Sequence, residues 1–326
     1  MKSITYAKAV CEAMDEEMAR DDKVLLFGED VAWKGGTYNA SVGLLDKYGP
    51  MRVFDTPISE SGFTGMGVGM AITGLRPIVE FMFGDFMLVA ADQLFNQAAK
   101  LRYMTGGQVK VPMVIRVATG GGRSMAAQHS QCLQSMAAMF PGMKVVLPSD
   151  AQEAKGLLKA SIRDDDPVMF LESKMLYNQT FEVDDEVEPI PLGKAKVVME
   201  GNDVTIVATS VMVLKAKEAA EKLKAEGISV ELIDLRTIVP LDMETVLKSV
   251  RKTGRLLICD EGYEMCNIAT EISFRVMEDA FYDMDAPVER LCTPNTSIPF
   301  TPALEYPLLP TNPDKVYAKV KHIMGK

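Results

Sequence analysis

The sequence predicts an α/β protein of two domains, each a mainly parallel sheet covered by helices. Short apolar runs that suit buried strands alternate with longer segments in which apolar residues recur every three to four positions, as in amphipathic helices. The chain has 326 residues, of which 48% are hydrophobic and 25% charged. This length and composition allow two ordinary hydrophobic cores and exclude disordered and fibrous classes.

In the N-terminal half, a helix is expected over residues 3–20, because Ile4, Ala7 and Val10 share one face. The apolar run 23–28 follows as a strand that ends at the acidic pair Glu29 and Asp30. Further strands are predicted over 51–54, 77–83, 111–117, 144–147 and 168–171, with helices after residue 60, over 86–104, and over 150–163 with Asp150 as its cap.

A domain boundary is expected where acids and prolines interrupt this alternation, over residues 182–200. We place a first domain at 1–185, a linker at 186–200 and a smaller second domain at 201–326. The second domain repeats the pattern of the first, with strands at 203–209, 228–234, 255–260 and 288–292 and helices at 211–226, 242–252, 265–281 and 313–324.

The net charge and the cysteine content limit the binding partners and the cellular compartment that the sequence allows. A formal net charge of −10 argues against nucleic acid or an anionic membrane as the main partner. No apolar run approaches the roughly 18 residues that a membrane span needs, so we expect a cytoplasmic protein. Five cysteines, an odd number without Cys-x-x-Cys spacing, predict reduced thiols that are mostly buried.

His129 is a candidate for proton transfer. It is one of only two histidines, and it lies in a run of small and polar residues, 126–131, after three consecutive glycines. Histidine changes its charge near neutral pH, which suits an acid or base. A structural histidine at the start of a helix is the plainer alternative.

Glu60 is the candidate carboxylate. It precedes a segment with glycines at 62, 65, 67 and 69, where each glycine costs a helix roughly 1 kcal/mol relative to alanine. Gly65 and Gly69 share a face, which predicts close packing at an interface between subunits or domains. A capping glutamate on the surface is the alternative for Glu60.

These segments together resemble a known family. Glu60 followed by Gly65 and Gly69 is similar to the pattern of thiamin-diphosphate enzymes in which a glutamate contacts the cofactor's aminopyrimidine, although Met70 stands where many members have glutamine. With the motifs at 28–31, 55–60, 74–77, 126–131, 234–237 and 240–242, the whole chain resembles the beta subunit of the decarboxylating component of 2-oxo acid dehydrogenase complexes.

The resemblance implies roles for four residues. Glu60 corresponds to the glutamate that hydrogen-bonds the cofactor's pyrimidine ring, and Phe86 to the aromatic residue that stacks on that ring. His129 corresponds to the histidine at the substrate end of the cofactor. Glu29 is a candidate for the surrounding network of acids, with a capping role as the alternative. For Phe86 the alternative is a core residue at a helix start.

The resemblance also implies metal ions. The family's magnesium-diphosphate pattern, Gly-Asp-Gly followed by Asn-Asn, does not occur in this sequence, so the Mg²⁺ ligands are expected from an alpha subunit in an alpha2-beta2 heterotetramer. A turn at 161–167 is similar to a loop that binds potassium in some relatives, mainly through carbonyl oxygens. The potassium candidates are Ser161, Ile162, Asp164 and Asp166.

The function that the resemblance implies is formation of a two-carbon carbanion from acetoin or pyruvate and reductive acylation of a lipoyl group on the acyltransferase component. Small residues before His129 are typical of members that use pyruvate or acetoin, and several other segments favour acetoin. A branched-chain 2-oxo acid dehydrogenase beta subunit is an alternative.

Two further functions belong to other classes. A nicotinamide-dependent dehydrogenase would need Gly-x-Gly-x-x-Gly at a strand-to-helix turn, and the glycines at 65, 67 and 69 have the wrong spacing. A non-catalytic docking subunit would need neither Glu60 nor His129. Docking and catalysis are compatible, because family members hold the acyltransferase core through their C-terminal domain.

Overall fold

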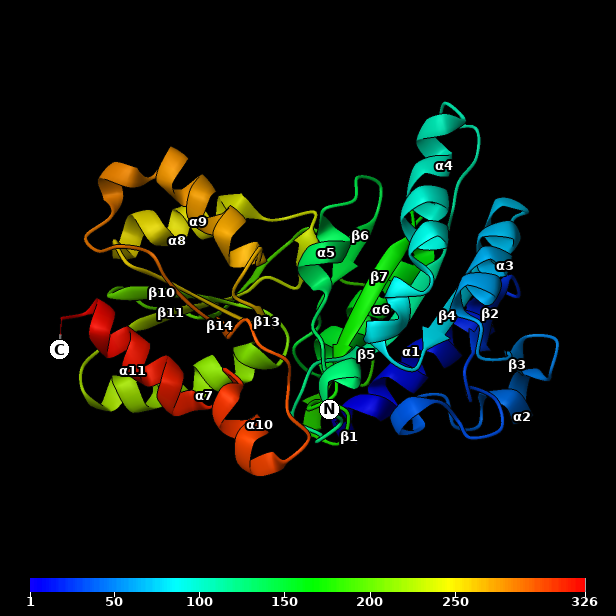
Figure 1. The fold of residues 1–326 in the computed structure, drawn as a ribbon, viewed down its shortest axis with the longest axis horizontal. Helices are drawn as coiled ribbons and strands as arrows, with labels where there is room; N and C mark the ends of the chain where they lie inside the picture. Colours follow the sequence, from blue (N-terminus) through cyan, green and yellow to red (C-terminus); the bar gives the residue numbers. More distant parts are fainter. Residues whose placement is uncertain (326) are drawn as a thin grey trace. The chain divides into compact units, whose positions relative to one another are not determined.

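The computed structural model describes residues 1–325 as two compact units, and the predicted α/β architecture of two domains is confirmed (Figure 1). Unit 1 comprises Met1–Thr119 and Met136–Leu192. Unit 2 comprises Gly120–Ser135 and the chain from Gly193 onward. The segment 120–135 therefore groups with the C-terminal unit, which no feature of the sequence had indicated.

Unit 1 is built on parallel strands in the order β6-β7-β5-β4-β2-β3. Every residue of β2, β5 and β7 is buried, as expected for strands covered on both faces. A separate antiparallel pair joins β1 (Lys2–Thr5) to β8 (Thr180–Val183). The parallel strands are β2 (Val24–Gly28), β3 (Val53–Asp55), β4 (Arg76–Phe81), β5 (Val114–Thr119), β6 (Lys144–Val146) and β7 (Val168–Ser173).

Helices α1 and α6 of unit 1 pack on each other through charged as well as apolar contacts. The Lys155 ammonium of α6 lies 2.9 Å from Glu12 and 2.7 Å from Glu16 of α1. Asp150 caps α6, as predicted, by accepting the Glu153 N–H. The helices are α1 (Tyr6–Arg20), α2 (Leu44–Tyr48), α3 (Glu60–Ile72), α4 (Ala99–Met104) and α6 (Ala151–Arg163), with the 3₁₀ turns η1 (Thr37–Asn39) and η2 (Gly84–Leu88) and the π-helical segment η3 (Asp92–Ala98).

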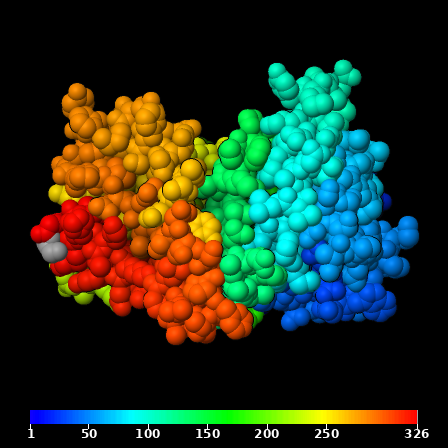
Figure 2. Space-filling view, in the orientation of Figure 1, coloured from blue at the N-terminus to red at the C-terminus, as the bar shows by residue number. Residues whose placement is uncertain are grey.

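Two predictions for unit 1 were wrong in detail. Residues 2–5 form β1 instead of the first turn of a helix, because their backbone pairs with β8, nearly 180 residues away along the chain. The single helix expected over 86–104 is divided into η2, η3 and α4. The end of α4 lies at the surface (Figure 2). Its last two residues, Tyr103 and Met104, are exposed.

Unit 2 has a sheet of strand order β14-β13-β10-β11-β9, in which only β9 is antiparallel. Helices α8 and α9 lie on one face, and α7 and α11 on the other (Figure 1). The strands of this sheet are β9 (Lys196–Met199), β10 (Val204–Ala208), β11 (Val230–Asp234), β13 (Leu256–Tyr263) and β14 (Glu289–Thr293), and the short strand β12 (Thr237–Val239) of the same unit is not one of them. The helices are α7 (Val211–Ala225), α8 (Met243–Thr253), α9 (Ile268–Asp279), α10 (Pro302–Leu308) and α11 (Pro313–Ile323), with the 3₁₀ turns η4 (Ala127–His129) and η5 (Phe281–Asp283); α5 (Gln134–Ala138) spans the point where the chain returns to unit 1.

The interval predicted as a linker, 186–200, ends in a strand. Its residues Lys196–Met199 form β9 and pair with β11. None of its four residues is fully buried, which suits the edge of a sheet, and its apolar run is only three residues long. The short elements β12 and α10 were also absent from the predicted set.

All five cysteines are free thiols, four of them buried and Cys266 exposed, as their number and spacing predicted. None of the helices within residues 1–325 combines the length and apolar character that crossing a membrane requires.

Candidate active site

The candidate site lies at the carboxyl edge of the unit 1 sheet. Gly28, the last residue of β2, is level with Asp55 of β3 and Glu80 of β4. Glu29 follows β2 directly, and Glu60 and Phe86 each come five residues after β3 and β4 end. Ligands of parallel α/β sheets bind beyond the carboxyl ends of the strands, so three of the predicted residues occupy the edge where a ligand is expected.

Glu60 begins α3 and is only 5% exposed. The glycine content of α3 has an explanation within the chain at Gly67, where a side chain would meet Met113 and Val79 at 3.0 Å. The helix thereby lies close to the sheet and carries Glu60 to its edge. A side chain at Gly65 would meet Gln93 of η3 at 3.1 Å, whereas Gly69 faces open space; the predicted subunit interface on this face stays a prediction.

Glu29 and Glu60 form a pair of buried acids. Glu29 is 5% exposed, and its Oε2 accepts the Met82 N–H at 2.9 Å, while its Oε1 has no hydrogen-bond partner among the described residues. Burial is the main cause that raises the pKa of Glu29 to about 7; the Met82 N–H opposes this rise, and the Glu60 carboxylate adds to it. Glu29 can therefore hold or release a proton near neutral pH.

Phe86 lies in η2 and is half-buried. It is thus neither a core residue, the alternative considered from sequence, nor fully exposed. Leu88 and Val89, two and three positions further along the chain, are 51% and 55% exposed. An aromatic ring with apolar neighbours open to solvent can accept a flat ring by stacking.

His129 ends the 3₁₀ turn η4 in unit 2 and is half-buried. The turn is entered through two non-glycine residues in the left-handed region, Ser124 with φ +55° and Ala126 with φ +62°. Such conformations cost energy and persist only where surrounding contacts hold them. The structure thus brings Glu29 and Glu60 together in unit 1 and places His129 in the other unit.

The predicted potassium loop is held by the chain's own basic side chains. The Arg76 guanidinium donates hydrogen bonds to the carbonyl oxygens of Ile162 and Asp164, at 3.1 and 2.9 Å. Lys144 pairs with the Asp164 carboxylate at 2.7 Å, and Arg102 with Asp166 at 2.5 Å. The Ser161 carbonyl accepts the Asp164 N–H. As it stands, this arrangement does not fit potassium, and binding of that ion stays a prediction.

A buried ion cluster was missed from sequence. Arg116 of β5 donates to both carboxylate oxygens of Glu172 on β7, at 2.8 and 3.0 Å, and to Glu80 on β4 at 2.6 Å. All three are at most 2% exposed. The signal available was one charged residue inside each of three otherwise apolar strands. The cluster supports the site, because the Glu80 carbonyl also accepts the Glu29 N–H at 3.3 Å.

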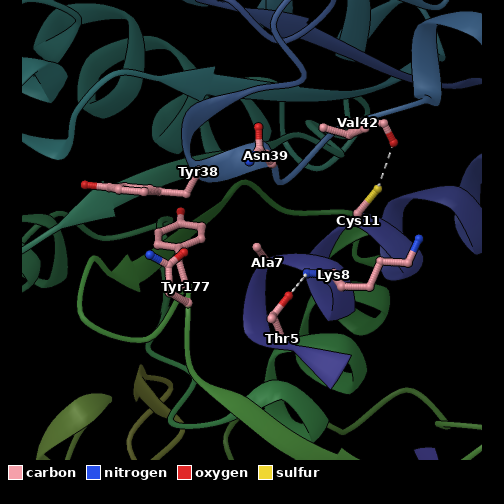
Figure 3. A pocket seen from close by; sticks show the side chains of 9 residues that line it. Thr5, Ala7, Lys8, Cys11, Tyr38, Asn39, Val42 and Tyr177 are labelled. Atoms are coloured by element: carbon pink, nitrogen blue, oxygen red, sulfur yellow. Dashed lines mark hydrogen bonds between the residues drawn. The ribbon is translucent and has the colours of Figure 1, made fainter. Parts of the chain in front are cut away.

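A cavity of about 600 Å³ in unit 1 contains none of the predicted site residues (Figure 3). Tyr38 stacks on Tyr177 beside it, with ring centres 4.6 Å apart, and the Cys11 thiol donates to the Val42 carbonyl. Burial raises the pKa of Cys11, so the thiol is a poor nucleophile at neutral pH. The lining residues are Thr5, Ala7, Lys8, Cys11, Tyr38, Asn39, Val42, Tyr177 and Asn178.

Comparison with known proteins places this geometry in a family. A family model described as the transketolase pyrimidine-binding domain matches residues 2–180, and a model of the transketolase C-terminal domain matches residues 193–316. A solved split-gene transketolase, an inactive beta4 tetramer, has the same fold, with a TM-score of 0.81, 24% identity, and coverage of 99% of this chain and 98% of that one.

Curated relatives match over nearly the whole of this chain. The pyruvate dehydrogenase E1 component subunit beta of Rickettsia bellii is 48% identical over 318 residues, covering 98% of both chains. The mitochondrial subunit beta-1 of Oryza sativa is 50% identical over 321 residues, covering 97% of this chain and 86% of the relative. The counterpart from Arabidopsis thaliana is 48% identical over 321 residues, covering 97% and 88%.

Proposed function

The chain belongs to the family of pyruvate dehydrogenase E1 beta subunits, and we propose that it provides the pyrimidine-binding half of a thiamin-diphosphate site shared with an alpha subunit. Membership makes it a component of a thiamin-diphosphate-dependent oxidoreductase. The proposed reaction is decarboxylation of pyruvate with release of CO2, followed by transfer of the remaining two-carbon unit to the lipoyl group of an acyltransferase component. The lipoyl disulfide is reduced as the two-carbon unit is oxidised to an acetyl group.

The Glu29–Glu60 pair carries this proposal. An aminopyrimidine ring offers both donor and acceptor nitrogens, so it pairs well with carboxyl groups that can be ionised or protonated at neutral pH. Glu29 has a pKa near 7 and one buried oxygen with no partner among the described residues. Buried polar atoms are normally hydrogen-bonded, and an exception of this kind is expected where a ligand supplies the partner.

Each candidate residue then has a distinct task. Glu60 would hydrogen-bond the pyrimidine ring, and Glu29, whose pKa is raised to about 7, would hold a proton beside it. Phe86 stacks on the ring, which orients it at the sheet edge. His129 donates a hydrogen bond or a proton to the substrate. When bound, thiamin diphosphate supplies the nucleophilic carbon that attacks the substrate carbonyl.

The alpha subunit would supply the magnesium-diphosphate site. The sequence contains no Gly-Asp-Gly followed by Asn-Asn, and no group of three His, Cys, Asp or Glu side chains within residues 1–325 is placed to hold a metal ion. Magnesium bound with a diphosphate needs oxygen ligands from protein as well as from the phosphates. An alpha2-beta2 heterotetramer would bring both halves of the site together.

We propose pyruvate as the substrate, because the curated relatives described above are named for pyruvate dehydrogenase. Acetoin is a second candidate, since it supplies the same two-carbon unit and several segments of the sequence favour it. Nothing in the comparisons supports the branched-chain or non-catalytic alternatives.

The test is reconstitution with the alpha subunit. The two chains are co-expressed, supplied with thiamin diphosphate and Mg²⁺, and assayed by dye reduction with pyruvate, acetoin and a branched 2-oxo acid in parallel. We expect the highest kcat/KM with pyruvate. Higher kcat/KM with acetoin would reassign the substrate, and a complex that binds the cofactor but reduces no dye with any substrate would overturn the proposed reaction.

A further inference from the structure

The loop that carries His129 is anchored by two buried carboxylates of unit 2. Residues 120–135 leave β5 and form little regular structure apart from the single turn η4 and the start of α5. The loop is closed by a hydrogen bond from the Gly120 N–H to the Gln131 carbonyl at 3.3 Å. Its conformation must therefore come largely from contacts with the rest of unit 2.

Glu305 holds the first part of the loop. Its Oε1 accepts the Gly122 N–H at 2.7 Å, and its Oε2 accepts the Ser124 N–H at 2.8 Å and the Ser124 hydroxyl at 3.2 Å. Gly122 and Ser124 have φ values of +86° and +55°. This left-handed backbone turns alternate N–H groups toward one point, which makes a concave binding site for an anion. Here the anion is a side chain of the same protein.

Glu305 is suited to this task because it is completely buried, although α10 itself reaches the surface (Figure 2). Its neighbours Leu304 and Tyr306 are 61% and 53% exposed. A side chain at Gly121 would meet Leu309 at 3.0 Å and the Glu305 carboxylate at 3.4 Å, so the loop lies directly on α10. The carboxylate is thus enclosed between helix and loop.

Asp260 holds the other end of the loop. Its Oδ1 accepts Gln134 Nε2 at 2.9 Å, Asn267 Nδ2 at 2.8 Å and the Gly262 N–H at 2.7 Å, and its Oδ2 accepts the Thr209 hydroxyl at 2.6 Å. Asp260 is also completely buried. His129 therefore lies between two fixed points, at residues 122–124 and at residue 134.

We propose that Glu305 is a positioning residue for His129, with Asp260 as the second anchor. This inference rests on the proposed function of His129. Removing the charge at 305 weakens three hydrogen bonds that hold the strained entry to η4, so the turn samples other conformations. A displacement of the order of 1 Å at a catalytic group can reduce rates by about 10²-fold, so the effect should appear in kcat.

The experiment compares Glu305→Gln with wild type in the reconstituted alpha–beta complex. We expect kcat to fall at least about tenfold, with little change in the concentration of thiamin diphosphate that gives half-maximal activity. Hydrogen exchange of a peptide covering 120–135 should become faster. Glu231→Gln is the matched control, because Glu231 is a buried unit 2 carboxylate that accepts the Gly201 N–H and pairs with Lys252, away from the loop.

A double-mutant cycle separates positioning from general stability. If Glu305 acts through His129, then Glu305→Gln should change kcat less than about twofold in a His129→Ala background, because the two changes remove the same contribution. The same fold-loss in both backgrounds would overturn the proposal. Unchanged exchange of 120–135 in Glu305→Gln would also overturn it.

Two further variants, Ser124→Ala and His129→Ala, separate failure of the positioning role from failure of the role assigned to His129. Ser124→Ala removes only the hydroxyl contact to Glu305, and it replaces Glu305→Gln if that variant does not fold. We expect a smaller fall in kcat together with faster hydrogen exchange of residues 120–135. No change in kcat or in exchange would contradict the proposal. Full activity of His129→Ala would overturn the assigned role of His129, whereas an inactive His129→Ala with unchanged exchange in Glu305→Gln would overturn only the positioning role.

Discussion

The two units differ in how many hydrogen-bond donors surround their buried carboxylates. In unit 1, Glu29 and Glu60 lie next to each other, each 5% exposed, and Glu29 accepts one backbone N–H while its other oxygen has no partner among the described residues. In unit 2, Asp260 and Glu305 are completely buried and accept four and three hydrogen bonds.

The difference shows that burial alone does not decide what a carboxylate does in the protein. Removing an ionised carboxylate from water is unfavourable unless hydrogen bonds replace the lost hydration. Where donors are plentiful, the carboxylate becomes an anchor for the backbone. Where they are scarce and a second acid is near, the group gains a raised pKa, as Glu29 does, and a proton becomes easy to exchange.

The largest expected effect tests the acid pair of unit 1. Glu60→Gln keeps the shape of the side chain but removes its ability to ionise, and kcat of the reconstituted complex should fall by about 10²- to 10⁴-fold. The thermal midpoint of the chain should change little. Ser61→Ala, on the exposed side of the same helical turn, is the control. If the Glu60→Gln complex keeps its activity, the unit 1 acids do not take part in the reaction, and in this respect they do not differ from the anchoring acids of unit 2.

The next effect tests the anchors of unit 2. Asp260→Ala leaves several buried donors without an acceptor, at a cost of about 1–3 kcal/mol for each unsatisfied group. We expect the free energy of unfolding to fall by at least about 3 kcal/mol, measured by urea denaturation. Asp279→Ala, at the exposed end of α9, is a suitable reference. A loss below about 1 kcal/mol would mean that Asp260 is not the anchor its contacts indicate.

A smaller effect is the pH dependence of stability. The pKa of Glu29 rises from 4.5 to about 7 on folding, so the folded state binds this proton more tightly than the unfolded state. Its contribution is complete below pH 4.5 and is lost as the pH rises through 7. Wild type should therefore lose at most about 3 kcal/mol from this group between pH 5 and 8.

Glu29→Gln should lack this part of the slope and gain stability relative to wild type at pH 8. Urea denaturation at unit steps of pH measures both chains, with Glu182→Gln, an exposed acid, as the control. Parallel curves for wild type and Glu29→Gln would show that Glu29 does not carry the raised pKa.

The smallest effect concerns a third set of acids, at 164–166, which basic side chains neutralise. Because Arg76 already donates to the Ile162 and Asp164 carbonyls, replacing Na⁺ by K⁺ at constant ionic strength should shift the thermal midpoint by less than about 2 °C. A larger, saturable rise with K⁺ alone would support the potassium site predicted from sequence and would require these carbonyls to face the ion.

Much of the architecture was available from the sequence. Continuous apolar runs separated by helical periodicity predict buried parallel strands, because a strand covered on both faces needs apolar side chains on both. The cap Asp150 marked a helix start through a local hydrogen bond that neighbouring residues determine. Glu60 and His129 were identified as candidates because each stands in a distinctive local motif.

Only the tertiary structure decided how these residues are combined. Glu29 and Glu60 lie 31 positions apart and meet because parallel register places the ends of β2 and β3 level. The division of the helix predicted over 86–104, the pairing of β1 with β8, and the anchoring of 120–135 by Asp260 and Glu305 likewise depend on segments distant in the chain. Periodicity and motifs reflect the conformational preference of one segment. The hydrogen-bond donors, the burial and the charges around a carboxylate come from other segments, and they determine whether it binds a backbone or exchanges a proton.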